Sequence, residues 1–295
     1  MYRVFSPRRH VRGLVAVLAL WLTVATVRHL PVAPAAASPA EGVAVPIIMY
    51  HSILDNPSRQ GDYVITPQQF EQDLQYLQGE GYTTVVMADL IAYVKEGVPL
   101  PDKAVVLTFD DGYYNNYRYA HPLLQKYGMR AVISPIAVWS EHYSAHPDEC
   151  NRDNYSHLTW EQLREMAGSG VWEIQNHSYD LHHMDGTQKG AAKRQGESDE
   201  GYRLRLTNDL ATAQKLLSEQ VGITPTTFAY PFGAISHASQ EALEKLGLEA
   251  SLSCEQRTAI LTRDPACLWR LGRYLRPANK DVKAILVTAD KSGLR

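Results

Sequence analysis

Short apolar runs alternate with longer amphipathic stretches along most of the chain from Val45 onward. Apolar runs bounded by polar residues indicate buried strands, whereas apolar residues spaced three and four apart indicate helices. The predicted strands are residues 45–50, 83–87, 104–109, 131–136, 171–175, 226–230, 248–252 and 271–274. The predicted helices are residues 67–79, 90–94 with their flanks, 117–127, 160–166, 204–221 and 240–246.

Several of the predicted helices carry boundary signals. Thr66 and Thr159 each precede a helix and have a glutamine three residues later, which is the pattern of a capping box. Pro67 fits the first turn, where a backbone N–H has no partner within the helix. Gly97 is a typical stop for the helix around residues 90–94.

Repeated alternation of strand and helix indicates a largely parallel sheet covered by helices. No linker rich in Pro, Gly or Ser divides this part of the chain, so we predict one domain over residues 43–291. Two polar stretches without periodicity, residues 140–157 and 185–201, are predicted to be long loops with a functional or mobile role. The second is a candidate lid over a substrate.

Hydrophobic residues make up 45% of the chain and charged residues 21%, which excludes a disordered chain, a collagen-like fibre and a polytopic membrane protein. The formal charge of −3 gives no support to nucleic-acid binding, which requires a basic surface. The charge is unevenly distributed. The first 40 residues hold five arginines and no acid, and the other 24 basic residues face 32 acidic ones, a charge of −8.

The N-terminal segment has the pattern of a targeting sequence. Residues 13–27 are apolar and small residues follow at 33–37. We therefore predict that residues 1–37 are either a signal peptide or a membrane anchor that attaches through residues 13–27. Both alternatives place the functional part outside the cytoplasm, where it is secreted, associated with the cell wall or anchored to the outer face of the cytoplasmic membrane.

Residues with catalytic potential follow three of the predicted strands. His51 follows the first strand, Asp110 and Asp111 follow the third, and His177 and His182 follow the fifth. Because the carboxyl ends of parallel strands meet at one rim, we expect these side chains to converge. One carboxylate and two imidazoles are a common ligand set for a catalytic divalent metal, so Asp111, His177 and His182 are the candidate ligands. The set suits zinc, and cobalt, nickel or iron would also fit.

Four short segments resemble the motifs of one known family. They are Leu107-Thr108-Phe109-Asp110-Asp111-Gly112, His177-Ser178-Tyr179-Asp180-Leu181-His182, Tyr230-Pro231-Phe232-Gly233 and Met49-Tyr50-His51-Ser52. In order and spacing they resemble the polysaccharide deacetylases, carbohydrate esterase family 4, over residues 46–277. The opening segment and the five-residue step between the two histidines resemble the branch that contains the secreted deacetylases of poly-β-1,6-N-acetylglucosamine.

This resemblance implies a distorted (β/α) barrel and metal-dependent hydrolysis of N-acetyl groups on a polysaccharide that contains N-acetylglucosamine. It implies that Asp110 is the general base and that Asp111, His177 and His182 bind the metal. His51 matches the residue that protonates the leaving amine. Peptidoglycan and chitooligosaccharides are alternative substrates, and an inactive polysaccharide-binding wall protein is the alternative from another class.

The third motif implies further roles. The backbone N–H of Phe232 matches the donor that binds the oxyanion. The family's motif usually opens with an arginine that steadies the base, and Arg273 could supply that charge here from a neighbouring strand. Tyr230, Pro231 and Tyr113 are the expected substrate contacts. We expect the chain to act as a monomer on an acetylated polysaccharide.

Three groups of residues remain open to two interpretations. Trp139 and Tyr143, like Tyr113, either stack on sugar rings or pack within the fold. Cys254 and Cys267 either form a disulfide or stay apart. Four residues of the polar stretch 140–157 either hold a structural zinc or belong to an irregular loop: His142, His146, Cys150 and His157.

Overall fold

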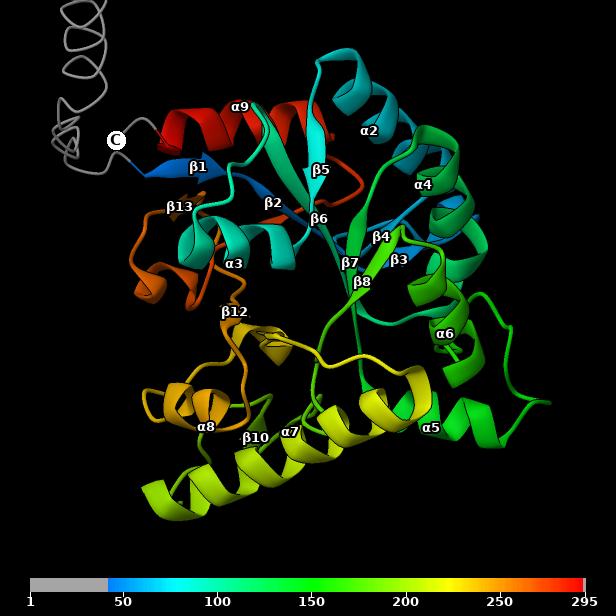
Figure 1. Ribbon diagram of the computed structural model, residues 1–295. Helices are drawn as coiled ribbons and strands as arrows, with labels where there is room; N and C mark the ends of the chain where they lie inside the picture. The colour runs from blue at the N-terminus through cyan, green and yellow to red at the C-terminus, as the bar shows by residue number, and fades with distance from the viewer. Residues whose placement is uncertain (1–41, 294–295) are drawn as a thin grey trace, which may run out of the picture. The chain divides into compact units, whose positions relative to one another are not determined.

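Parallel strands form the centre of the protein, for which a computed structural model describes residues 42–293. These strands are β2 (Ile47–Tyr50), β5 (Thr83–Val85), β6 (Ala104–Asp111), β7 (Ala131–Pro135), β8 (Trp172–Ile174) and β14 (Tyr274–Leu275). The sheet has the order β14–β2–β6–β7–β8, and β5 pairs with the first residues of β6 (Figure 1). All eight residues of β6 are buried, as expected for a strand with neighbours on both sides and cover on both faces.

Two more strands, β11 (Thr227–Ala229) and β12 (Ala250–Leu252), pair in parallel with each other. Single parallel bridges join them to the sheet on both sides: Asn176, just after β8, pairs with Phe228, and Leu252 pairs with Leu271, just before β14. The sheet is therefore closed, but only by single bridges at its two seams. This geometry confirms the predicted distorted (β/α) barrel.

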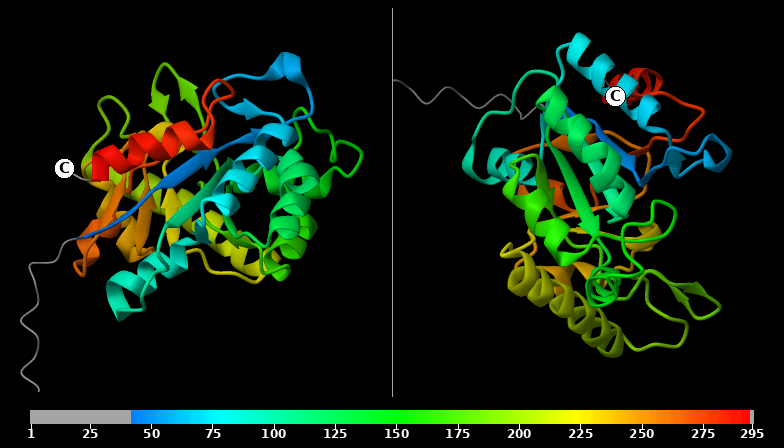
Figure 2. Two further views of the ribbon diagram at one scale, coloured as in Figure 1. Left: turned by 90° about the horizontal axis from the view of Figure 1, so that it is seen from above. Right: turned by 90° about the vertical axis from the view of Figure 1, so that its right-hand side faces the viewer.

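Helices surround the strands, as Figures 1 and 2 show from three sides. Their bounds are α2 Pro67–Gly79, α3 Met87–Glu96, α4 His121–Tyr127, α5 Ala137–Ala145, α6 Trp160–Gly168, α7 Asp199–Val221, α8 Ser239–Lys245 and α9 Val282–Gly293. Both predicted capping boxes are present, with the Thr66 hydroxyl accepting from the Gln69 N–H and the Thr159 hydroxyl from the Gln162 N–H. Gly97 ends α3 at a φ of 83°.

The pleat of β6 separates two apolar cores. Leu107 and Phe109 face outward and pack with residues of α2, α4, α6 and α9. Val106 faces the opposite way, into the barrel, where it packs with Val132 and Leu252. Because side chains alternate along a strand, Thr108 and Asp110 share the inner face with Val106.

Several elements differ from the prediction. The stretch 140–157 is helical in its first part, since α5 continues to Ala145, and α7 begins within the stretch 185–201 because Ser198 caps it. Helix α9 was not predicted. Short pairs of strands were also missed: β1 (Val43–Val45) with β13 (Ala259–Leu261), β3 (Ser52–Ile53) with β4 (Val64–Ile65), and β9 (Met184–Asp185) with β10 (Gln188–Lys189).

Of the two alternatives left open for Cys254 and Cys267, the structure shows the one without a disulfide, because both thiols are free. The Cys254 sulfur lies 3.9 Å from the guanidinium of Arg273, and Cys267 faces Thr262. The predicted targeting segment, residues 1–37 with its apolar stretch 13–27, lies outside the described residues. Within residues 42–293, no helix combines the length and the apolar character that crossing a membrane requires.

Candidate active site

The candidate residues converge at the carboxyl ends of the strands. Asp110 and Asp111 are the last two residues of β6, His51 directly follows β2, and His177 follows β8. Asp111 has a left-handed φ of 70° and Gly112 a φ of 73°. A Cβ atom on Gly112 would lie 2.7 Å from the Cβ of Pro135, so only glycine fits this turn.

Asp111, His177 and His182 form a cluster that could hold a metal ion. The Oδ1 atom of Asp111 lies 3.4 Å from Nε2 of His177 and 3.2 Å from Nε2 of His182. One ligand atom from each residue lies within 4.8 Å of the others, and no second group of this kind occurs in residues 42–293. Asp111 Oδ1 is buried without a hydrogen bond. A buried carboxylate oxygen that lacks a donor, facing two imidazole nitrogens, fits a divalent cation.

The second nitrogen of His177 fixes the orientation of its ring. Nδ1 donates to the carbonyl oxygen of Ala229 at 2.8 Å, so Nε2 keeps the lone pair that a metal ligand needs. Ser178, which also has a positive φ of 78°, supports the same segment by accepting from the N–H of Leu181. Ser178 is therefore a structural residue of the motif.

Asp110 is held by Arg273. The guanidinium donates to both carboxylate oxygens at 2.7 and 2.8 Å, and the Arg273 side chain is fully buried. Arg273 reaches this position across the barrel interior and also donates to the Ser253 carbonyl at 2.9 Å. Burial alone would raise the pKa of Asp110, but the adjacent Arg273 cation lowers it below its usual range. Asp110 is therefore ionised at neutral pH.

His51 lies beside the same two carboxylates. Burial lowers its pKa, although the charges of Asp111 and Asp110 act in the opposite direction. Its Nδ1 atom is buried and has no hydrogen-bond partner in the described part of the chain. The ring instead makes a T-shaped contact with Tyr63, with ring centroids 4.8 Å apart. Sequence reasoning missed Tyr63, because it lies in a short irregular segment whose contact with His51 has no periodic signal.

The turn at residues 231–233 supplies a backbone donor beside the cluster. Phe232 has a φ of 57°, and its ring centroid lies 4.2 Å from that of His182. The hydrogen bonds of this turn run from the N–H groups of Gly233 and Ala234, so they do not use the N–H of Phe232. The contact of the Phe232 ring with His182 places this turn beside the Asp-His-His cluster.

Tyr230 and Pro231, the expected substrate contacts, are both buried. Tyr230 is 1% exposed, and its hydroxyl group bonds to Ser239 at 2.7 Å. Pro231 is also buried. Both residues belong to the core behind the turn. Tyr113 is half-buried next to Asp111, and burial together with that carboxylate raises its pKa.

The histidines of residues 140–157 do not form a second metal site. His142 pairs with Glu149 at 3.0 Å, His146 bonds to the backbone of His142, and Cys150 bonds to the backbone of Pro147. His157 lies apart from them, with its ring 4.8 Å from that of Tyr113. The structural-zinc interpretation is therefore wrong for the described residues.

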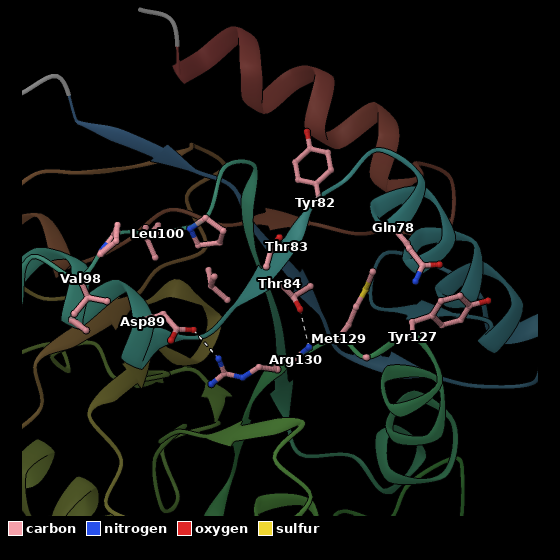
Figure 3. A pocket seen from close by; sticks show the side chains of 15 residues that line it. Gln78, Tyr82, Thr83, Thr84, Asp89, Val98, Leu100, Tyr127, Met129 and Arg130 are labelled. Atoms are coloured by element: carbon pink, nitrogen blue, oxygen red, sulfur yellow. Dashed lines mark hydrogen bonds and ion pairs between the residues drawn. The ribbon is translucent and has the colours of Figure 1, made fainter.

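A pocket of about 560 Å³ lies at the opposite end of the strands, where β5 meets the start of β6 (Figure 3). An Asp89–Arg130 ion pair at 3.0 Å crosses it, and the Thr84 hydroxyl accepts from the Arg130 N–H. In Figure 3, Tyr82 lies above Thr83, and Tyr127 lies to the right of Met129. This pocket contains no group of residues that could hold a metal, so the candidate chemistry belongs to the other rim.

A parallel barrel whose rim carries an Asp-His-His cluster and a neighbouring ionised carboxylate has the site of a metal-dependent hydrolase. A family model described as polysaccharide deacetylase matches residues 97–251. The chain belongs to the polysaccharide deacetylase family. His51 and Arg273 lie outside the matched range, so the segments on either side of it complete the site.

Individual relatives agree with this assignment. The chain is 29% identical over 231 residues to the poly-beta-1,6-N-acetyl-D-glucosamine N-deacetylase of Escherichia coli K12, covering 72% of this chain and 34% of that protein. It therefore spans about a third of that relative's length. The Staphylococcus aureus protein of the same name is 26% identical over 196 residues, covering 66% of this chain and 63% of that protein. A solved de-N-acetylase from Aggregatibacter actinomycetemcomitans has a TM-score of 0.71 and 26% identity, covering 83% of this chain and 99% of that one.

Proposed function

We propose that this protein hydrolyses N-acetyl groups on a polysaccharide of the poly-β-1,6-N-acetylglucosamine class and releases acetate. The observation that carries the proposal is the buried Arg273–Asp110 pair beside the Asp-His-His cluster. A binding module would gain nothing from an ionised carboxylate kept inside a barrel, because such a group is costly to bury. The names of the relatives from Escherichia coli and Staphylococcus aureus support the substrate class.

Asp111, His177 and His182 would hold the metal. Zinc suits one carboxylate and two imidazoles, and cobalt, nickel or iron would accept the same ligands. When bound, such an ion supplies Lewis acidity that lowers the pKa of water and polarises a carbonyl group. Three protein ligands leave open positions for water and substrate, as catalytic sites require.

Different residues around the cluster carry out the separate proton transfers. Asp110 accepts the proton of the attacking water, and its low pKa keeps it ionised for this step. The N–H of Phe232 donates to the oxygen that becomes negative in the tetrahedral intermediate. His51 donates a proton to the leaving amine. Burial lowers its pKa, so the ring must first take up a proton, and the one that Asp110 removes from water can supply it. Water and the acetamide thus become acetate and the amine in its ammonium form, without a covalent enzyme intermediate.

The proposed activity takes place outside the cytoplasm, because the predicted targeting segment at residues 1–37 precedes the barrel. The deacetylated product carries ammonium groups. The acidic balance of the rest of the chain, with a charge of −8, would attract such a cationic glycan.

Acetate release from a panel of acetylated glycans tests the proposal. The panel contains β-1,6-linked N-acetylglucosamine oligomers, chitooligosaccharides and peptidoglycan, and metal content is measured in the same samples. We expect the fastest release from the β-1,6 oligomers. The Asp110→Asn protein should keep its metal and release no acetate, and release at the wild-type rate would refute the mechanism. Glycan binding without acetate from any substrate would identify a binding protein instead.

A further inference from the structure

Four stacked rings lead away from the metal-binding cluster, and we call them the aromatic ladder: Tyr113, His157, Trp139 and Tyr143. The ladder begins two residues after the ligand Asp111. The ring centroids of Tyr113 and His157 are 4.8 Å apart, with an angle of 34° between the planes. His157 then stacks on Trp139 at 5.6 Å and 16°, and on Tyr143 at 5.8 Å and 21°. The rings thus form a continuous series of contacts that starts beside Asp111.

The backbone around the ladder is fixed to the active-site segments. Tyr113 and His157 form an antiparallel bridge, in which the N–H of Leu158 donates to the Gly112 carbonyl at 2.8 Å. The start of α5, two residues before Trp139, donates from the Ala137 N–H to the carbonyl of Ser178 at 3.1 Å. Tyr143 is held through its hydroxyl group, which donates to the Tyr155 carbonyl at 3.0 Å. The ladder is therefore held in place before any ligand arrives.

His157 is the polar member of the ladder. Its Nδ1 atom is buried and has no hydrogen-bond partner among residues 42–293, which is costly for a purely structural histidine. Burial lowers the pKa of His157 to about 4, so the ring is uncharged at neutral pH. An uncharged imidazole behind Trp139 adds no charge that a neutral sugar would have to desolvate.

Trp139 is the exposed end of the ladder. It is 41% exposed although one face of its ring lies on His157. An indole kept at the surface and backed by stacked rings is suited to bind a flat, partly apolar ligand. Sugar rings have such faces, since their axial C–H groups lie together on one side. Trp139 also carries an N–H donor, which matches the hydroxyl groups around a sugar.

We propose that the aromatic ladder is a sugar-binding subsite, in which Trp139 stacks on a residue of the glycan next to the one that is deacetylated. The proposal rests on the proposed function, because it assigns the ladder to the same acetylated polysaccharide. It implies that the protein prefers oligomers over a single acetylated sugar. The ladder positions the chain, whereas Asp110 and His51 act on the reacting group.

The test compares the Trp139→Ala protein with the wild type on two substrates, the methyl glycoside of N-acetylglucosamine and its β-1,6-linked pentamer. We expect the KM for the pentamer to rise by about tenfold in Trp139→Ala, the upper range for loss of one aromatic contact. The rate on the methyl glycoside should stay unchanged. The matched control is Tyr82→Ala, which removes a partly exposed ring at the opposite end of the strands (Figure 3).

If Trp139→Ala does not fold, the same comparison is made with Trp139→Leu, which keeps an apolar side chain against His157. An unchanged pentamer KM, an equal loss on both substrates, or the same change in Tyr82→Ala would overturn the subsite. Calorimetric binding of the pentamer to Asp110→Asn, with and without Trp139→Ala, provides a readout independent of turnover. If the wild type releases no acetate from any glycan, the proposed function fails, and this binding comparison alone decides the role of the ladder.

Discussion

Replacing Arg273 with glutamine separates two roles of this residue, stabilising the barrel and setting the protonation of Asp110. The two side chains are 0% and 4% exposed and form two hydrogen bonds of 2.7 and 2.8 Å. Removing one partner of such a buried pair leaves an uncompensated charge and costs about 3–5 kcal/mol of unfolding free energy. The same change removes the cation that lowers the pKa of Asp110, so this pKa should rise.

The lowered pKa of Asp110 determines how the stabilising effect of the pair changes with pH. Since the folded-state pKa of Asp110 is lowered, the ionised pair stabilises the fold fully above the unfolded-state pKa of about 4. That stabilisation is lost as the pH falls through the lower folded-state pKa. The stability difference between wild type and Arg273→Gln should therefore be largest at neutral pH and shrink in acid. The acid limb of kcat/KM should move to higher pH in the variant, because Asp110 must be ionised to act as base.

The chain offers a matched control in the Arg276–Asp73 pair. It is 2% exposed on both sides, has hydrogen bonds of 2.7 and 3.0 Å, and lies outside the active site. Urea unfolding should show that Arg276→Gln loses stability by a similar amount. Acetate release measured against pH should show no shift of its acid limb. An acid limb that stays at the wild-type position in Arg273→Gln would refute the positioning role and leave Arg273 as a structural residue.

Three further predictions address the metal cluster, the turn beside it and the proposed acid. His177→Ala should lower bound metal by at least about tenfold and abolish acetate release, as measured by elemental analysis and an acetate assay; full metal occupancy would contradict the ligand assignment. Gly112→Ala should destabilise the fold by about 1–3 kcal/mol in urea, because its Cβ would lie 2.7 Å from Pro135; unchanged stability would show that the turn can relax. Tyr63→Ala should lower kcat about fivefold with little change in KM, whereas Tyr63→Phe should retain activity, because the ring contact orients His51; equal losses would point to the hydroxyl group instead.

Apolar runs and capping residues in the sequence predicted those strands and helices whose cause lies within a few residues. The apolar run of β6 and the capping box at Thr66 each contain the physical cause of the element within a few residues. Barrel closure has no such signal, because it rests on the single bridges Asn176–Phe228 and Leu252–Leu271. Helix α5 was missed for a related reason, since no side-chain cap marks its start and its N-terminal N–H groups bond to the segment after His177.

The sequence predicted those residues of the candidate site that lie at strand ends or in the motifs. Asp110, Asp111 and His177 follow or end apolar strands, so the parallel topology alone brings them to one rim. The inward direction of Asp110 is a matter of strand parity, and the guanidinium that meets it comes from a residue 163 positions later. Residues so far apart in the sequence come into contact only because the barrel is closed. For the same reason, the stacking of His157 on Trp139 was not visible in a stretch that lacks periodicity.

Backbone strain links the fold to the chemistry at this rim. Of the six non-glycine residues with positive φ among those described, Asp111, Ser178 and Phe232 all lie in the motifs of the site. Each such conformation costs about 1–3 kcal/mol and persists only where the surroundings enforce it. Glycine would relieve the strain at Phe232, but it would remove the ring that packs 4.2 Å from His182. We therefore expect the turn to keep a strained aromatic residue because its ring packs on His182, a proposed metal ligand, and glycine would lose this contact.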